Sequence, residues 1–453
     1  MKTLAVLAAL AATPAAAQSM PDMPGMSHDT AAAQPADPHA GHDMSGMDMS
    51  DMPTNADDYE LTRTAGMAMM AGTLGSYSMM RDASGTSWQP DSTPMEGIHG
   101  QAGGWSTMLH GYVLGVYDHQ GGPRGDDKAF SESMLMAAAQ RQAGPGTLTL
   151  RTMLSLDPLM GKDGYPLLLQ TGETANGTDP LIDRQHPHDL FMELSATYAL
   201  PLTDTTSAFL YAGYPGEPAL GPPTFMHRFS GMDNPEAPIS HHWLDSTHIT
   251  YGVLTGGLVR GNWKIEGSLF NGREPDEHRW DFDKARLDSA SVRLSWNPAQ
   301  DWAVQVSYAD IKQPEALEPG VDQHRATASV SYNRPLKGGN WQTTLAWGQN
   351  NLSPGPTLDA WLLESALNLG RHTVFARAER AEKNELFEAP SPLAHQAFNV
   401  GKFSLGYIYD VPVAQHLSLG LGALGSLYDL PKAIQPAYGD PQSYMLFVRF
   451  KLR

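Results

Sequence analysis

Methionine and histidine side chains recur at short intervals close to the amino terminus of the chain. Their spacing of two or three residues lets a flexible segment fold several ligands around one ion. Thioethers favour Cu(I), imidazoles suit Cu(II), and the aspartates between them raise the local concentration of cations. Hard ions such as Mg²⁺ prefer shells made entirely of oxygen. The pattern predicts copper binding, with a solvated linker as the alternative, and the predicted ligands are Met20, Met23, Met26, His28, His39, His42, Met44, Met47, Met49 and Met52.

A second group of histidines lies in the middle of the chain, in segments rich in polar residues. Imidazoles and the carboxylates beside them could form a metal site of mixed nitrogen and oxygen ligands. Polar loop residues are more often solvated or bonded to neighbouring loops, and this remains the alternative interpretation. The candidate ligands are His186 and His188 in the sequence RQHPHD, then His227, His241 and His242, with His248 just beyond them.

The composition limits the chemistry that the chain can support. The 453 residues include 23 Met and 17 His but no Cys, which excludes disulfides, thiol catalysis and the thiolate-bound copper of a multicopper oxidase. With 49 acidic against 30 basic residues, we do not expect nucleic-acid binding. No catalytic triad or phosphate-binding loop occurs in a convincing context, so we predict that the protein is not an enzyme and has no organic cofactor.

The first residues predict export across the inner membrane. Lys2 precedes an apolar stretch and a run of three alanines, as in a cleaved signal peptide. The following arm has no branched aliphatic and no basic residue, so it cannot bury enough surface to fold alone. No later segment is apolar for long enough to form a membrane-spanning helix. The predicted segments are a signal peptide (1–17), a disordered metal-binding arm (18–60), a Met-rich transition that could act as a plug (61–104) and a barrel (105–453).

From Trp105 onward, short segments alternate between apolar and polar side chains and are bounded by turn residues. Tight connections such as Gly144-Pro145 alternate with long polar ones such as 158–189 and 215–245. Tight turns at one end and long loops at the other are typical of outer-membrane proteins. We therefore predict an all-β, transmembrane outer-membrane β-barrel of about 16 antiparallel strands. The expected strands are 105–119, 129–143, 146–157, 190–201, 205–214, 246–260, 262–272, 284–297, 301–311, 324–335, 340–350, 358–369, 371–381, 398–411, 415–428 and 443–453.

The alternation also predicts which side chains face lipid. In the last segment, Leu446 and Phe450 fall on one face and Arg449 on the other, and at 190–200 Met192 falls on the apolar face. Barrel strands place apolar groups outward and tolerate charges inside, so we expect a wet lumen lined by charges such as Arg377. A soluble sandwich or propeller is the alternative. The residues expected in an interfacial aromatic girdle are Trp105, Trp263, Trp296, Trp302, Trp341 and Tyr444.

The order of leader, arm and barrel resembles the copper resistance protein B family. The arm carries the resemblance by motif, in MPDMPGMSHD and HAGHDMSGMDMSDMP, and the remainder of the chain carries it by architecture only. Sixteen strands would exceed the usual barrel of that family. The resemblance implies copper tolerance, an arm that binds copper in the periplasm, and a barrel in the outer-membrane lipid of a Gram-negative cell. It also suggests a periplasmic copper-binding protein or oxidase as partner.

Two other functions stay open on the sequence alone. A general or solute-selective porin would use the same barrel, with the arm incidental to its role. A secreted enzyme on an all-β scaffold would share the alternating strands and the export signal, but would need no lipid.

Overall fold

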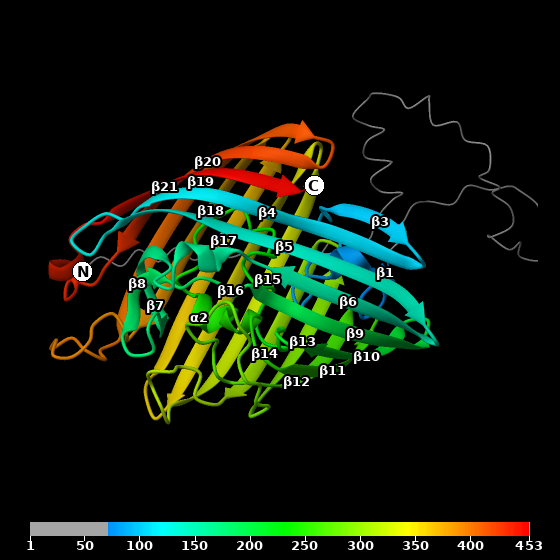
Figure 1. Cartoon of the computed structure of the whole chain (residues 1–453), viewed down its shortest axis with the longest axis horizontal. Coiled ribbons are helices and arrows are strands. Elements are labelled where there is room, and N and C mark those ends of the chain that lie inside the picture. Colours follow the sequence, from blue (N-terminus) through cyan, green and yellow to red (C-terminus); the bar gives the residue numbers. More distant parts are fainter. Residues whose placement is uncertain (1–70, 453) are drawn as a thin grey trace, which may run out of the picture. The chain divides into compact units, whose positions relative to one another are not determined.

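The chain folds into one closed barrel of sixteen antiparallel strands (Figure 1). A computed structural model describes residues 71–452, so the predicted signal peptide and metal-binding arm lie outside the described residues. The barrel strands are β4 (Trp105–His119), β5 (Asp127–Ala143), β6 (Gly146–Leu154), β9 (Phe191–Thr203), β10 (Thr206–Gly213), β11 (Val253–Arg260), β12 (Trp263–Phe270), β13 (Ser289–Ala299), β14 (Trp302–Ile311), β15 (Asp322–Leu336), β16 (Gly339–Ser353), β17 (Thr357–Leu369), β18 (His372–Lys383), β19 (Phe398–Ala414), β20 (Leu417–Asp429) and β21 (Gln442–Leu452).

Each of the sixteen predicted segments overlaps one of these strands, which confirms the predicted fold class, although the predicted strand 246–260 is shortened to β11 because residues 246–248 form a short helix. The barrel closes because β21 pairs with β4, from Tyr444 opposite His119 to Lys451 opposite Tyr112. The short strand β3 (Ile98–Ala102) pairs with the start of β4, where β21 has ended. A sheet closed in this way leaves no free edge, so the alternative of a soluble sandwich or propeller is wrong.

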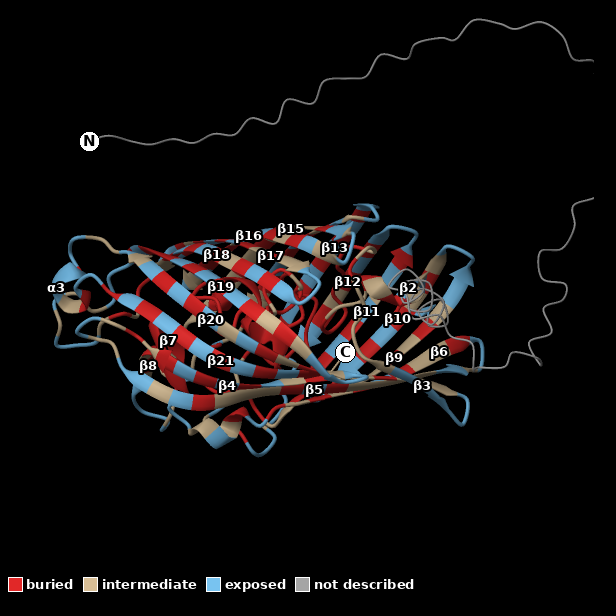
Figure 2. Cartoon of the chain, turned by 90° about the horizontal axis from the view of Figure 1, so that it is seen from above, coloured by how far each residue is buried: buried red, intermediate tan, exposed pale blue. Residues whose placement is uncertain are grey.

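The outer face of the barrel is apolar, and the alternation along β21 shows how this arises. Leu446, Val448 and Phe450 are exposed, whereas Phe447 and Arg449 between them are buried. Figure 2 shows the same alternation of buried and exposed residues along other strands of the wall. Exposed leucine, valine and aromatic side chains in a continuous belt require lipid rather than water. The barrel is therefore of the outer-membrane kind and is surrounded by outer-membrane lipid.

Aromatic rings gather at the barrel end where the turns are tight. Trp263 stacks on Trp296 with ring centroids 4.9 Å apart, and Trp302 lies 4.6 Å from Tyr332. Trp341 is 5.8 Å from Tyr332 on the next strand, and the four tryptophans are all exposed. This arrangement confirms the predicted girdle at one membrane interface.

The long connections fold inward and cover the other end of the barrel. They contain the hairpin β7 (Tyr165–Thr174) and β8 (Pro180–Gln185) and the short helices η2 (Asp157–Met160), α2 (His241–Leu244), η3 (Ser246–His248) and α3 (Gln435–Tyr438). Every residue of β7 is buried, and Leu168 and Leu169 pack with Ile239 of the next long connection. No helix among residues 71–452 is long and apolar enough to cross a membrane.

A stretch before the barrel enters the tight-turn end and is called here the inserted segment (residues 79–93). It follows β1 (Ala71–Gly72) and β2 (Gly75–Ser78) and begins with η1 (Met79–Arg81). Arg293 of the wall donates to the Thr86 hydroxyl at 3.0 Å, and the Ser92 amide donates to the Gln300 carbonyl at 2.9 Å. The segment therefore occupies the bore close to the turns.

The expectation of a wet, charge-lined lumen is wrong for the described residues. Arg377, Glu379, Lys264, Glu266, Arg293 and Arg449 all face inward but are buried. Each has at least one partner on a neighbouring strand, the inserted segment or an inward loop, because buried charges persist only when paired. Arg377 donates to the Glu236 carbonyl at 2.7 Å, and Glu379 accepts from the Ser240 hydroxyl at 2.7 Å.

Met192 also departs from its predicted place on the lipid face. The register of β6 against β9 shifts between Met153 and Leu154, so Leu154 pairs with Phe191 while Met153 pairs with Glu193. A bulge of this kind turns an extra side chain to the other face. Met192 is fully buried in the inner core as a result.

Candidate metal centre in the barrel lumen

Two inward loops bring five histidines together inside the barrel. His186 and His188 follow β8, in the connection between β6 and β9. His241 and His242 begin α2 and His248 ends η3, all in the connection between β10 and β11. All five side chains are buried. The site thus joins residues separated by about sixty positions in the sequence, which only the inward folding of both loops makes possible.

The imidazole rings are spaced closely around His248. Its ring centroid lies 5.2 Å from that of His188 and 5.2 Å from that of His241. His242 is 5.7 Å from His241, and His186 is 6.2 Å from His242. Three imidazoles that ligate one tetrahedral ion through bonds of about 2 Å have centroids about 5 Å apart. The distances from His248 to His188 and to His241 are both close to that value.

Each of these three rings is oriented through its Nδ1 atom. His188 bonds to the Asp157 carboxylate at 2.9 Å, and His241 bonds to the Asp245 carboxylate at 2.7 Å. His248 donates to the main-chain carbonyl of Asp245 at 2.9 Å. A carbonyl only accepts hydrogen bonds, so the ring proton of His248 lies on Nδ1. This is the arrangement by which proteins orient metal-binding histidines.

The opposite ring nitrogens are left without partners. Among residues 71–452, the Nε2 atoms of His188, His241, His242 and His248 are buried and have no hydrogen-bond partner. A buried polar atom without a partner is uncommon and calls for a water or an ion. With the proton on Nδ1, the Nε2 atoms of His188, His241 and His248 each carry the lone pair that a metal ion requires.

Burial determines the protonation state of the histidines, and the Arg228 guanidinium keeps Asp245 ionised. Desolvation lowers the pKa of His186 to about 3 and lowers the pKa values of His241, His242 and His248, so these imidazoles are neutral at pH 7. Burial works to raise the pKa of Asp245, but the Arg228 guanidinium holds it well below its ordinary value. The centre therefore combines neutral nitrogen donors with two carboxylates behind them, Asp157 and Asp245, and the charge of Asp245 is paired with Arg228.

The loop that carries α2 is tied to the barrel wall on both sides of the histidines. The Trp243 indole donates to the Leu358 carbonyl at 3.0 Å, and the Asn350 amide donates to the His242 carbonyl at 3.0 Å. On the other side, Gly172 of β7 lies so close that a methyl group there would fall 1.8 Å from Cε1 of His242. These contacts position the rings on a rigid frame.

Within the part of the chain that the structure describes, no three of these histidines have ligand atoms that all lie within 4.8 Å of one another, so the rings would have to turn toward an ion in order to share it. Among the described residues, the groups that already meet this spacing lie on one connection and are acidic: Asp276, Glu277 and His278, and Asp276 with Asp281 and Asp283. Most of these residues are exposed, and exposed acidic groups are common without an ion. The buried histidines are the stronger candidate, because their donors are oriented and dry.

Four of the predicted histidines meet at this site, namely His186, His188, His241 and His242. His227 lies apart, with its Nε2 atom 3.1 Å from the Met153 sulfur and its ring 5.6 Å from His110. His248 is central to the site although it is outside the predicted ligand set. Asp157 and Asp245 were also missed, because nothing in the local sequence marks a carboxylate as the orienting partner of a distant ring. The ligands predicted on the arm, Met20 to Met52, lie outside the described residues.

Similarity to known proteins is confined to the fold. No family model matches the sequence, and no curated protein matches it. The solved structure of Salmonella typhi OmpF in complex with daunomycin is similar at a TM-score of 0.50 and 9% identity, over 78% of this chain and 100% of that chain. An anion-selective porin from Comamonas acidovorans (TM-score 0.43, 11% identity, 77% and 100% covered) and OmpT of Vibrio cholerae (0.43, 8%, 78% and 100%) are also similar.

The protein has the fold of an outer-membrane porin. At such low identity, the likeness to OmpF extends to the closed barrel and not to ligands or activity. The outer-membrane β-barrel fold is confirmed, whereas the resemblance to the copper resistance protein B family and its copper chemistry stay predictions.

Proposed function

We propose that this protein is a non-enzymatic outer-membrane barrel that binds copper in its lumen and exports or sequesters the ion. The observation that carries the proposal is the group of buried Nε2 atoms without partners, on rings whose Nδ1 atoms are held by Asp157 and Asp245. Imidazole suits copper, zinc and nickel alike, whereas the thioethers of the arm favour copper. The two ligand types together select copper as the cargo.

In this proposal, the arm captures the ion in the periplasm and the lumenal histidines receive it. Met20 to Met52 form a flexible set of weak ligands, which exchange one at a time and so release an ion readily. A periplasmic copper-binding protein or oxidase is the partner that would supply the ion. The copper resistance protein B resemblance agrees with this division of roles.

Copper(II) electron paramagnetic resonance of the full chain in detergent tests the lumenal site. The arm histidines are first removed as competing ligands by His28→Gln, His39→Gln and His42→Gln. In that background, we expect nitrogen couplings from several imidazoles, and we expect His248→Gln to reduce their number. His278→Gln, on the exposed connection, is the matched control and should change nothing. Identical spectra from the His248 variant and its parent would contradict the proposal.

A solute-selective porin is the second candidate function, and the porin fold is the observation that favours it. Copper tolerance of cells separates the two. Cells that keep full tolerance after deletion of residues 20–52, and also after His248→Gln, would favour the porin.

A further inference from the structure

A second cavity lies at the tight-turn end of the barrel, between the inserted segment and strands β4 to β6. Its volume is about 80 Å³, which is room for several water-sized groups. Protein interiors seldom leave a space of this size without an occupant. Five methionines line it, together with two histidines: Met79, Met95, Met108, Met136 and Met232, with His110 and His227.

A buried methionine is ordinarily a packing residue, so the histidines decide the interpretation. The Nε2 atom of His227 lies 3.1 Å from the sulfur of Met153. Met153 lies outside the cavity lining, so this contact holds the His227 ring in place. The His110 ring stands edge-on to that of His227 at 5.6 Å. Met136 lies directly opposite His110 in the pairing of β4 with β5, and both side chains line the cavity together with His227.

The charges facing the cavity favour a monovalent ion. Asp82 and Glu96 line it, but so do Arg151 and Lys451. Arg151 pairs with Glu193 at 2.8 Å, and Lys451 pairs with Glu96 at 2.5 Å. The basic groups offset the acidic ones, so a divalent ion gains little net attraction here. Neutral thioethers and imidazoles are the ligands that Cu(I) and Ag(I) prefer.

The cavity is adjacent to the histidine centre described above. A smaller cavity of about 20 Å³ touches His186 and His188, and Tyr112 and Met232 line both cavities. The chain itself also joins the two sites. Phe225 lies against the ring of His241 at 5.4 Å, and His227 two residues later faces the methionines.

We propose that this methionine-lined cavity is a binding site for a soft monovalent cation, Cu(I) or Ag(I), with Met136, His227 and His110 as its principal ligands. In this proposal it is the first binding site that the ion meets inside the barrel, next to the inserted segment. The ion then passes from thioether to imidazole ligands across the wall formed by Tyr112 and Met232. This route rests on the proposed function, whereas the binding site stands on its own geometry.

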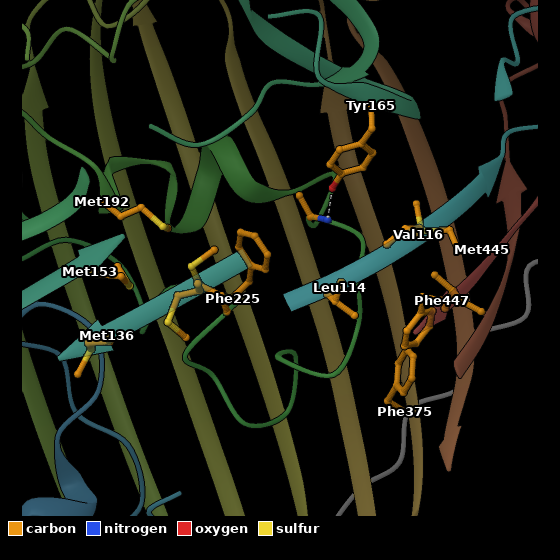
Figure 3. Packing of buried hydrophobic residues seen from close by; sticks show 14 of the residues in the cluster. Leu114, Val116, Met136, Met153, Tyr165, Met192, Phe225, Phe375, Met445 and Phe447 are labelled. Carbon is orange, nitrogen blue, oxygen red and sulfur yellow. Dashed lines mark hydrogen bonds between the residues drawn. The ribbon is translucent and has the colours of Figure 1, made fainter. Parts of the chain in front are cut away.

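Silver titration of the full chain in detergent tests the site, because Ag(I) binds thioethers without redox chemistry. We expect Met136→Leu and His227→Gln each to abolish one high-affinity class of Ag(I) binding. Leucine preserves apolar volume, so Met136→Leu should keep the fold. Met445→Leu is the matched control, since Met445 is a buried methionine of the same core that lies with Phe447 in Figure 3, on the other side of Phe225 from Met136 and Met153.

Anomalous scattering from silver in crystals of the wild-type chain gives a second measurement and should place an ion in the cavity beside Met136, His110 and His227. Unchanged silver stoichiometry in both cavity variants, or an equal loss in the Met445 control, would overturn the inference. So would crystals in which silver lies elsewhere. If the silver experiments contradict this cavity site while the copper(II) signal still depends on His248, the proposed function stands and only the proposed site in the cavity is refuted.

Discussion

Replacing Asp245 with asparagine should weaken copper binding in the lumen without dismantling the site. The Asp245 carboxylate accepts from His241 at 2.7 Å and from Arg228 at 2.8 Å, and all three side chains are buried. An asparagine amide can donate to Nδ1 of His241 instead. The ring proton would then move to Nε2 and occupy the lone pair meant for the ion.

The expected loss of copper affinity can be worked out from the role of Asp245, which orients the ligand His241. Loss of such a partner costs about 10- to 100-fold in metal affinity, or roughly 1.4–2.8 kcal/mol. The loss should be partial, because His248 bonds to the main-chain carbonyl of residue 245, which the substitution leaves in place. Breaking a buried ion pair costs about 3–5 kcal/mol of stability. We expect the low end of that range, since Arg228 keeps its partner Glu364.

Competition between the protein and a copper(II) chelator provides the assay, in the background that lacks the arm histidines. Asp276→Asn is the matched control, because Asp276 contacts His278 at 3.2 Å on an exposed connection. An Asp245→Asn protein that competes as well as its parent would refute the argument that Asp245 orients a ligand. A drop of the same size in Asp276→Asn would refute it as well.

Three further predictions concern pH, packing and the bore. Lumenal copper(II) binding should fall less steeply than copper(II) binding to free histidine as the pH is lowered from 7, because burial lowers the pKa values of His241, His242 and His248, whereas free histidine protonates near 6.5. The buried histidines bind protons in the unfolded chain and not in the folded chain, so the metal-free protein should lose stability as the pH falls below about 6.5. A free energy of unfolding that does not change with pH would argue against neutral buried rings. Gly172→Ala should lower the free energy of unfolding by about 1–3 kcal/mol and weaken copper binding, because Gly172 has a φ of +111° and a methyl group there would strike His242. Gly144→Ala is the control, since Gly144 has a φ of +61° but open space around it and should show the backbone cost alone. Equal thermal unfolding of the two variants would exclude the clash. Arg81→Ala should raise the ion conductance of the protein in planar bilayers, because Arg81 pairs with Asp91 inside the inserted segment and ties that segment to the Gly261 carbonyl and Asn262. Arg334→Ala removes an exposed side chain at the same end and should leave the conductance unchanged. Equal conductances of the two variants would mean that the inserted segment does not limit the bore.

The barrel wall could be predicted from the sequence, because lipid-facing and inward-facing side chains alternate with a period of two along each strand. Leu446 and Arg449 face opposite ways wherever the strand goes, and turns such as Gly144-Pro145 mark its ends. The exception at Met192 arose from a bulge, which is a property of two paired strands. The alternation of one strand alone cannot reveal it.

The interior was less predictable, since it depends on where long loops come to rest. The charges on the inner face were expected to meet water, and they meet loop groups such as the Glu236 carbonyl and the Ser240 hydroxyl instead. The histidine motif RQHPHD was visible, yet its companions His241 and His248 were assigned to it only by spatial proximity. The contact between Met153 and His227 likewise became evident only from their proximity in the structure.

Residue type and periodicity determined the strands, the lipid-facing belt and the supply of soft ligands, because each of these is a local property of the chain. The tertiary structure alone decided which imidazoles share a site, which carboxylates orient them, and that methionines surround a cavity beside His227. Those features arise from contacts between segments far apart in sequence, and a contact of that kind leaves no trace in either segment by itself.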